Sequence, residues 1–416
     1  MSTPNVTYHT IDGRNAGTWA VLIIFAVMAA IGFLAAMYMD HNGHWVTGMT
    51  NHVVWGLPIA IAIFLIVSST GCLNVASIGS VFEKQPYKPF GRLAGITALA
   101  VQAGGLFMLV LDLGRNDRII TFVTNLNPTS IFSLNVFLYS GFFIFVAFYL
   151  WTMMDGKKMG HLYRPAALLA FTWRLILTTG SGSIFGFMVS RSAYHSTLVA
   201  PLFIALSMSF GLAMYVLVML WLNASTGRKY PSPELLRRLR ILLGILVGVS
   251  LYFVVIHHLT NYYTAERRDV EKFLLFGDNV YVPLLWVGFG LIGSVIPMAL
   301  VLLPARTFGS AKISLGLASA LVVFGGHCFM YAFVIGGQAF PIELFPGKIV
   351  SSSFGDGAIA HYAPSLPELL LIIGGYGVTG LLITVVIWAL PMLPSSFSAE
   401  TADRLHHLHE IEANAH

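Results

Sequence analysis

Ionisable side chains within long apolar stretches are the first candidates for chemistry in this protein. Asp112 and Arg115 stand three residues apart at the end of one such stretch, and Asn51 and His52 precede another. A charged group costs free energy in an apolar layer, so it is usually retained for a function. Carboxyl and imidazole groups form hydrogen bonds with polar ligands and exchange protons with them. These four residues predict a site for a ligand with carbonyl or hydroxyl groups.

Each of these residues also has a purely structural interpretation. Asp112 and Arg115 are spaced to form a pair on one helix face at the edge of a membrane. His52 stands close to Trp55, and Trp is enriched at membrane interfaces. In either interpretation we expect Arg115 to hold the Asp112 carboxyl.

Two further groups of polar residues lie inside apolar stretches. Asn135 and Tyr139 have the i, i+4 spacing that directs two side chains toward one pocket. Arg174 lies about ten residues into another stretch, and hydroxyl residues and glycines follow it. A predicted proton route consists of Arg174, Thr178, Ser181 and Ser183. The alternative is a packing seam, in which glycines let helices approach closely and backbone carbonyls hold Arg174.

The histidines and cysteines raise the question of a resident redox centre. One b-type haem between His327 and either His257 or His258 is an alternative interpretation. No apolar stretch, however, carries two histidines at the spacing of a stacked-haem protein. Cys72 and Cys328 alone cannot supply the four thiolates of an iron–sulfur cluster. We therefore expect no haem and no iron–sulfur cluster in this protein.

The elements that position these residues are long apolar helices. A membrane-spanning helix needs about 20 predominantly apolar residues. Ten stretches meet this requirement, at about 17–39, 53–79, 91–113, 130–153, 165–190, 198–223, 240–263, 280–304, 313–336 and 366–391. The prediction is an all-α, polytopic integral membrane helical bundle. Its parts are an N-terminal tail (1–16), a ten-span domain (17–391) and a C-terminal tail (392–416).

Positive charge sets the predicted orientation. Fifteen of the 23 Lys and Arg residues fall in the two tails and the loops on one side of the bundle, and only seven fall on the other. Basic loops remain in the cytoplasm, so both termini are predicted to be cytoplasmic. The remaining cation, Arg174, lies inside a span.

Composition excludes other classes of protein. With 56% hydrophobic residues, 10% charged residues and a mean hydropathy of +0.78, the protein is not a soluble domain. Its apolar runs are continuous, whereas the strands of a membrane barrel alternate apolar and polar residues. The net charge of +5 is concentrated on the predicted cytoplasmic loops. This distribution indicates contact with lipid headgroups of the membrane and no nucleic-acid partner.

Polar groups gather on the predicted outer side of the bundle. A lipid-soluble quinone, with two carbonyls on an apolar ring, suits such a site. The outer loop at 337–365 is rich in glycine and proline yet keeps large apolar residues. We expect this loop to pack on a partner protein or to fold back over the bundle.

Several strings resemble the NrfD/PsrC family, the membrane subunits of polysulfide-reductase-like complexes. The resemblance covers all ten spans and includes the ten-helix branch with the HybB proteins. The strings that carry it are Trp55-Gly56-Leu57-Pro58, Asp112-Leu113-Gly114-Arg115, Asn127-Pro128-Thr129-Ser130 and Gly182-Ser183-Ile184-Phe185-Gly186. His258-Leu259-Thr260-Asn261 and Ile335-Gly336-Gly337-Gln338-Ala339-Phe340-Pro341 are further similar to the DsrP-type subunit of the dissimilatory sulfur-metabolism membrane complex.

This resemblance implies a subunit without a redox centre of its own. Such a subunit exchanges electrons between a membrane quinone, either menaquinone or ubiquinone, and a periplasmic ferredoxin-like iron–sulfur subunit. It implies that Asn51 and His52 lie where the family's quinone-contacting Asn and His occur. The DsrP similarity adds a multihaem cytochrome c, a haem-b membrane subunit and a cytoplasmic iron–sulfur subunit as neighbours. Coupled proton translocation across the inner membrane is a further expectation.

Three other functions compete with this interpretation. A haem-b electron-transfer subunit would show a reduced α-band in its visible spectrum. A secondary transporter would take up substrate without redox partners, using Arg174 and Asp112. A passive membrane anchor would use its outer polar residues only to dock another protein.

Overall fold

The structure is a computed structural model that describes residues 8–11, 15–226, 232–304, 310–342, 345, 348 and 351–394. Several residues used in the charge argument lie outside these ranges, namely Arg14, Arg228, Lys229, Arg306 and Arg404. The predicted tail boundaries, 1–16 and 392–416, stay predictions for the same reason.

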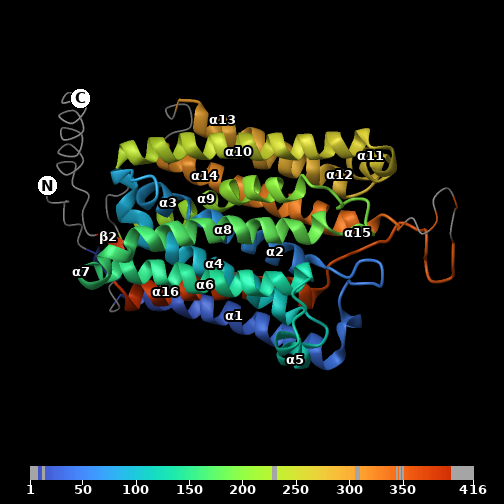
Figure 1. The fold of residues 1–416 in the computed structure, drawn as a ribbon, viewed down its shortest axis with the longest axis horizontal. Helices are drawn as coiled ribbons and strands as arrows, with labels where there is room; N and C mark the ends of the chain where they lie inside the picture. Colours follow the sequence, from blue (N-terminus) through green and yellow to red (C-terminus); the bar gives the residue numbers. More distant parts are fainter. Residues whose placement is uncertain are drawn as a thin grey trace.

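Most of the described residues lie in helices (Figure 1). They are α1 (Ala16–Asn42), α2 (Leu57–Cys72), α3 (Asn74–Ser80), α4 (Gly91–Leu111), α5 (Ile119–Thr124), α6 (Ile131–Met154), α7 (Gly156–Met159), α8 (Tyr163–Gly186), α9 (Val199–Thr226), α10 (Pro233–Tyr263), α11 (Arg268–Phe276), α12 (Tyr281–Pro283), α13 (Ile296–Leu302), α14 (Ala311–Tyr331), α15 (Gly337–Ala339) and α16 (Leu366–Ala389). Two π-helical segments, η6 (Leu284–Val295) and η8 (Ala332–Gly336), continue α12 and α14. The short 3-10 helices include η1 (His44–Val46) and η2 (Gln85–Phe90).

Ten segments of the described residues are long and apolar enough to cross a membrane, which confirms the predicted helical membrane bundle. They are Ala16–Asn42, Leu57–Ser80, Gln85–Leu111, Ile131–Met154, Gly160–Gly186, Val199–Ser225, Pro233–Tyr263, Tyr281–Leu302, Ala311–Ala339 and Leu366–Ala389. The helices run roughly parallel, so the bundle has two ends (Figure 1). We call the end with β1, β2 and α7 the strand end. The end with α5, α11 and residues 351–365 is the loop end.

The largest departure from the predicted spans is the start of α10. The sequence predicts residue 240, but the helix begins at Pro233 and is capped by Ser232, whose hydroxyl accepts from Leu235 N at 3.2 Å. The basic residues Arg237 and Arg238 therefore lie in the first turns of a helix and not in a loop. Both pair with Glu234, and such polar turns escape a search based on hydropathy.

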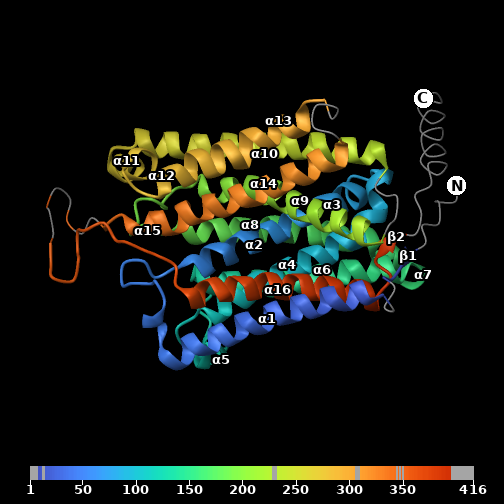
Figure 2. The same ribbon diagram turned by 180° about the vertical axis from the view of Figure 1, so that it is seen from behind.

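Packing places α2 at the centre and α1 at the edge. Along its most apolar window, the span that contains α2 is 94% buried, whereas α1 is only 17% buried. α1 and α16 run side by side along one edge of the bundle, and α10 and α13 lie along the opposite edge (Figure 2). Gly32 of α1 meets Gly374 of α16 so closely that a Cβ on either would collide with the other's Cα. Contacts between small residues of this kind let membrane helices pack backbone to backbone.

A short sheet closes the strand end. β1 (Tyr8–His9) pairs antiparallel with β2 (Leu393–Pro394), so that Tyr8 lies opposite Pro394. Arg92 supports this contact, because its guanidinium packs on the Tyr8 ring and donates to the Pro391 carbonyl at 3.0 Å.

Candidate functional site

Asp112 caps the C-terminal end of α4 at the loop end of the bundle. The residue is only 5% exposed, and neither carboxyl oxygen has a hydrogen-bond partner among the residues that the structure describes. Burial, and to a lesser degree the nearby Glu368, raises the pKa of Asp112 to about 8. A buried carboxyl that changes charge near neutral pH is suited to exchanging a proton with a bound ligand.

Glu368 is another acidic residue at this end. Both of its carboxyl oxygens have hydrogen-bond partners, whereas those of Asp112 have none among the described residues. It lies in the first turn of α16, where Ser365 N donates to its Oε2 at 2.7 Å. Tyr362 donates to its Oε1 at 2.7 Å, and Gly48 N donates to Oε2 at 2.9 Å. Glu368 therefore fixes the loop after α1 against the start of α16. Its position also brings a second acidic group close to Asp112.

The loop after α1 reaches the end of α4 as well. His44, in η1, donates from Nε2 to the Asp112 backbone carbonyl at 3.2 Å. His44, Tyr362 and Glu368 are absent from the predicted site residues. A local signal exists for Glu368 alone: Ser365 stands three residues before it, which is the pattern of a capping box at a helix start.

An apolar groove of about 600 Å³ lies beside this region, on the side of the bundle. α1 contributes Ile31, Leu34, Ala35 and Tyr38, η1 contributes Val46, and α16 contributes Leu366, Pro367 and Leu370. Val46 is two residues from His44, and Leu366 is two residues from Glu368. Since α1 lies at the edge of the bundle, the groove faces the lipid.

His52 lies at the same end but points elsewhere. Its ring Nε2 donates to the Phe354 carbonyl at 3.1 Å, and its own carbonyl accepts from Arg191 Nη2 at 2.8 Å. Asn51 beside it is exposed. His52 thus joins the loop that precedes α2 to residues 351–365. No hydrogen bond among the described residues joins its ring to the Asp112 carboxyl.

Gln338 of α15 holds the turn that precedes α2. Its Oε1 accepts from the backbone nitrogens of Val54 and Trp55, both at 3.0 Å. Its Nε2 donates to the Trp55 carbonyl at 3.0 Å. Arg191 Nη1 donates to the Gln338 carbonyl at 2.6 Å. The loops at this end are therefore tied to one another by polar contacts.

The predicted pairing of Arg115 with Asp112 is wrong. Arg115 Nη2 lies 2.8 Å from Asp117 Oδ2, and both of these side chains are mostly exposed. The reason is that α4 ends at Leu111, so residues 112 and 115 do not share a helix face. Asp112 keeps its carboxyl buried while Arg115 extends into the solvent.

Asn135 and Tyr139 belong to α6, on the side that packs against α8. Asn135 Nδ2 donates to the Ile131 and Gly180 carbonyls at 2.8 and 3.2 Å. Tyr139 lies close to Ser181 of α8. These two residues therefore adjoin the predicted proton route.

Arg174 is buried at the junction of α8 with α2 and α3. Its Nη1 donates to Asn74 Oδ1 at 2.8 Å and to the Thr70 carbonyl at 3.1 Å. Thr178 continues the contact, since its hydroxyl donates to Thr70 Oγ1 at 2.8 Å. The structure thus joins Arg174 and Thr178 in one network through α2.

The other two residues of the predicted route lie further along α8. Ser181 and Ser183 donate to the backbone carbonyls of Leu177 and Thr179, one turn earlier in the same helix. Neither hydroxyl is bonded to α2 among the described residues. The structure therefore joins Arg174 and Thr178 of the predicted route through α2. Ser181 and Ser183 instead donate to the backbone of α8.

His327 and His257, two of the three candidate ligands in the alternative haem interpretation, are bonded within the protein. His327 bonds through Nδ1 to the Val323 carbonyl at 2.6 Å and through Nε2 to the Tyr376 hydroxyl. His257 is bonded to Asn261 at 3.2 Å. With both ring nitrogens of His327 bonded, neither is free as a haem ligand in this arrangement. Within the described ranges, no group of three or more His, Cys, Asp or Glu side chains is placed to hold a metal ion.

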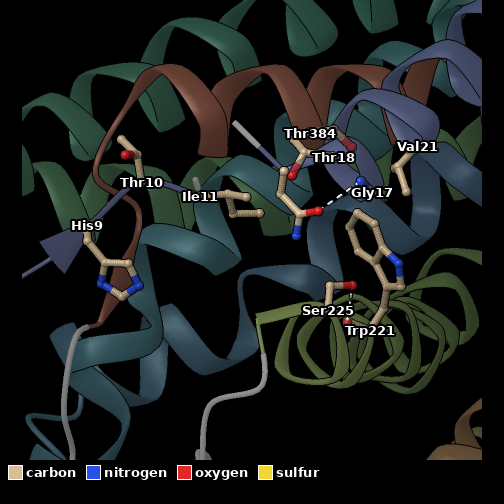
Figure 3. Close-up of a pocket in the computed structure, with 10 residues that line it drawn as sticks. His9, Thr10, Ile11, Gly17, Thr18, Val21, Trp221, Ser225 and Thr384 are labelled. Atoms are coloured by element: carbon tan, nitrogen blue, oxygen red, sulfur yellow. Dashed lines mark hydrogen bonds between the residues drawn. The ribbon is translucent and has the colours of Figure 1, made fainter. Parts of the chain in front are cut away.

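A further cavity of about 370 Å³ lies at the strand end, between α1, α9 and α16 (Figure 3). Trp221 and Ser225 of α9 face Thr18 and Val21 of α1 across it. None of the predicted site residues lines this cavity.

Comparison with known proteins gives one matching family model, described as polysulphide reductase, NrfD, over residues 45–342. The protein is 30% identical to the Hdr-like menaquinol oxidoreductase integral membrane subunit of Archaeoglobus fulgidus, over 96% of its own length and 99% of the relative. It is 23% identical to a selenate reductase subunit of Mesobacillus selenatarsenatis, over 89% and 93% of the two sequences. It is 26% identical to a polysulfide reductase subunit of Wolinella succinogenes, over 70% and 96%.

Proposed function

Because this chain belongs to the polysulphide reductase NrfD family, we propose that it is the quinone-reactive membrane subunit of a multi-subunit oxidoreductase. The family and the ten apolar segments found among the described residues make it a multi-pass integral membrane protein. The names of its relatives, a menaquinol oxidoreductase subunit and a polysulfide reductase subunit, support a quinone as the substrate.

The observation that carries this proposal is the Asp112 carboxyl at the loop end. With a pKa of about 8, Asp112 is mostly protonated at neutral pH and can donate a hydrogen bond to a quinone carbonyl. In its ionised form it accepts a hydrogen bond from a quinol hydroxyl. The lipid-facing groove between α1 and α16 provides an apolar approach to this end from the membrane.

The other residues act around Asp112. Glu368 keeps a second negative group nearby, which favours the protonated form of Asp112. His44 positions the end of α4 by holding the Asp112 carbonyl. The predicted contacts of the quinone with Asn51, His52, Asn135 and Tyr139 stay proposals.

The orientation follows from the charge distribution. Arg92 belongs to the strand end, and so does α7 with Lys158 of another predicted cytoplasmic loop, so the loop end would face outward. In a bacterial cytoplasmic membrane, the quinone site would then lie near the periplasmic surface. A proton route from the cytoplasm through Arg174 and Thr178 would give proton translocation a structural basis.

The loop end also suits the proposed partner, a periplasmic ferredoxin-like iron–sulfur subunit. Trp45, Tyr263 and Phe354 are each more than 80% exposed at this end. Exposed aromatic side chains are typical of protein interfaces. The partner would exchange electrons with the quinone through such a contact. The other proposed members of the complex are a multihaem cytochrome c, a haem-b membrane subunit and a cytoplasmic iron–sulfur subunit.

A fluorescence-quench titration of the purified full-length protein with a quinone analogue tests the proposal. Asp112→Leu should weaken saturable binding about tenfold, or about 1.4 kcal/mol. Asp117→Leu is the matched control, because Asp117 is exposed and five residues away. Saturable binding that is indifferent to Asp112→Leu would move the site away from Asp112. A wild-type protein without saturable binding would contradict the quinone function itself.

A further inference from the structure

A second buried polar cluster lies at the loop end, on the opposite edge of the bundle from Asp112. Glu271 of α11 is only 1% exposed. Its Oε2 accepts from His258 Nδ1 at 2.7 Å, and its Oε1 accepts from Asn261 Nδ2 at 2.9 Å. A buried carboxylate is costly unless such donors satisfy it. α11 folds back over the end of α10 and thereby brings Glu271 to His258.

The two arginines of the α10–α11 turn are already engaged. Arg267 donates to Asn261 Oδ1 at 3.1 Å and to His195 Nδ1 at 3.4 Å. Arg268 donates to the backbone carbonyls of Tyr262 and Tyr263. Both guanidinium groups are therefore committed to holding the α10–α11 turn.

The contact with Glu271 places a proton on His258 Nδ1, which bears on the hydrogen bonds that Nε2, the other ring nitrogen, can form. With its proton on Nδ1, a neutral imidazole keeps a lone pair on Nε2 and can accept one hydrogen bond there. His258 Nε2 is buried and has no hydrogen-bond partner among the described residues. A buried polar atom without a partner is costly in a native structure, so a ligand that supplies a donor would gain this contact.

His258 lines an apolar groove of about 340 Å³ between α10, α11 and η6. Val255 and Leu259 of α10 line it, together with Phe276 of α11 and Trp286 of η6, and these four residues are more than half exposed. Such apolar exposure on a membrane helix indicates that the groove opens to lipid. The wall formed by η6 is π-helical, and widened helical turns of this kind occur frequently at functional sites.

The opposite side of the cluster cannot admit a ligand. His257 and His258 also border an inner hollow with Phe329 and Phe333, but its volume is only about 10 Å³. A hollow of that size holds about one water molecule. The lipid-facing groove, which His258 also lines, is the side from which we expect a larger partner for His258 Nε2 to approach.

We propose that this groove is a second ligand site, which binds the headgroup of a lipid-soluble quinol with its apolar tail in the membrane. One quinol hydroxyl donates to His258 Nε2, while Glu271 holds the ring through Nδ1. The aromatic side chains of Phe276 and Trp286 pack against the quinol ring. The choice of a quinol rests on the proposed function, whereas the groove and the His258–Glu271 pair do not.

The lining of the groove favours a quinol over a phospholipid. No Lys or Arg is among the described residues that line it. A phosphate headgroup needs positive donors, and both nearby guanidinium groups are engaged with neighbouring residues. A neutral hydroxyl, in contrast, matches a single nitrogen acceptor at the head of an apolar groove.

Photolabelling of the purified full-length protein in lipid nanodiscs with an azido-quinol tests this site. Peptide mapping should find label within residues 251–290. Val255→Trp fills the groove from the lipid side and leaves the buried cluster intact, so labelling of this segment should fall about tenfold. Ile245→Trp is the matched control, since Ile245 is also exposed on α10 but does not line the groove. His258→Phe should have the effect of Val255→Trp, provided that its thermal unfolding midpoint matches the wild type.

The outcomes separate this inference from the proposed function. No label within 251–290, or label unchanged by Val255→Trp, would overturn the second site. Label displaced by excess phosphatidylglycerol but not by excess unlabelled quinol would assign the groove to phospholipid. That result would also overturn the proposed quinol site. Asp112→Leu should leave this labelling unchanged. Labelling of the groove together with no quinone binding at Asp112 would contradict the proposed site and leave this one standing.

Discussion

The Tyr362 hydroxyl donates to Glu368 Oε1 at 2.7 Å and accepts from Leu57 N at the same distance. One phenol thus joins the start of α2 to the start of α16, across about 300 residues of sequence. Because Gly48 N also donates to Glu368, three separate segments converge beside Asp112. The geometry of the candidate site depends on this contact.

Tyr362→Phe should destabilise the protein by about 1–3 kcal/mol, because the change removes the hydroxyl that bonds both the Leu57 N–H and Glu368. The thermal unfolding midpoint in detergent measures the effect. Tyr263→Phe is the matched control, since Tyr263 is 84% exposed. An equal midpoint for Tyr362→Phe and wild type would contradict the proposed importance of this contact.

Quinone-analogue binding should weaken as the pH rises through about 8. Below its pKa of about 8, Asp112 is protonated and donates to a quinone carbonyl; above it, the carboxylate cannot donate. The Asp112→Asn variant keeps an N–H donor that does not titrate, so its affinity should stay flat. Dissociation constants measured between about pH 6 and pH 9 decide the matter. A wild-type profile as flat as that of the variant would refute the role of Asp112.

His52→Ala is expected to change quinone-analogue affinity by less than about twofold. The His52 ring is bonded to the Phe354 carbonyl, so its loss should instead free residues 351–365. Limited proteolysis should then cut this segment faster in the variant. Affinity weakened about tenfold, without faster cleavage, would restore the direct quinone contact predicted from the sequence.

Thr178→Val should slow proton uptake in proteoliposomes that contain the whole complex, because it removes the hydroxyl that donates to Thr70 Oγ1. We expect a rate lower by about fivefold, measured with a pH-sensitive dye trapped inside the vesicles. Thr179→Val provides the control, as its exposed hydroxyl donates to the Leu175 carbonyl of its own helix. Equal rates for the two variants would leave the α2–α8 network with a packing role alone.

Much of the fold could be predicted because each membrane span is a local property of about 20 residues. The start of α10 could not, since its first turns are charged and resemble a loop. The sequence predicts the end of α4 at residue 113, whereas the helix ends at Leu111, and this small difference separates Arg115 from Asp112.

The candidate site is only partly predictable for a different reason. Asp112 is a lone carboxyl in an apolar stretch, so sequence alone singles it out. Glu368 and His44 act through contacts with residues far away along the sequence, which no local pattern reveals. Glu271 also escapes prediction, because it lies in a charged segment that is exposed for the most part.

Because α1 packs against α16, the helical bundle cannot be fully assembled until α16 has been synthesised. Gly32 and Gly374 are about 340 residues apart, so roughly 20 to 70 s of synthesis separate the two partners. During that interval, the poorly buried first helix resides in the bilayer without its neighbour, and the groove between α1 and α16 does not exist. α16, the last helix among the described residues, therefore completes this groove, and a protein truncated before it would lack the groove.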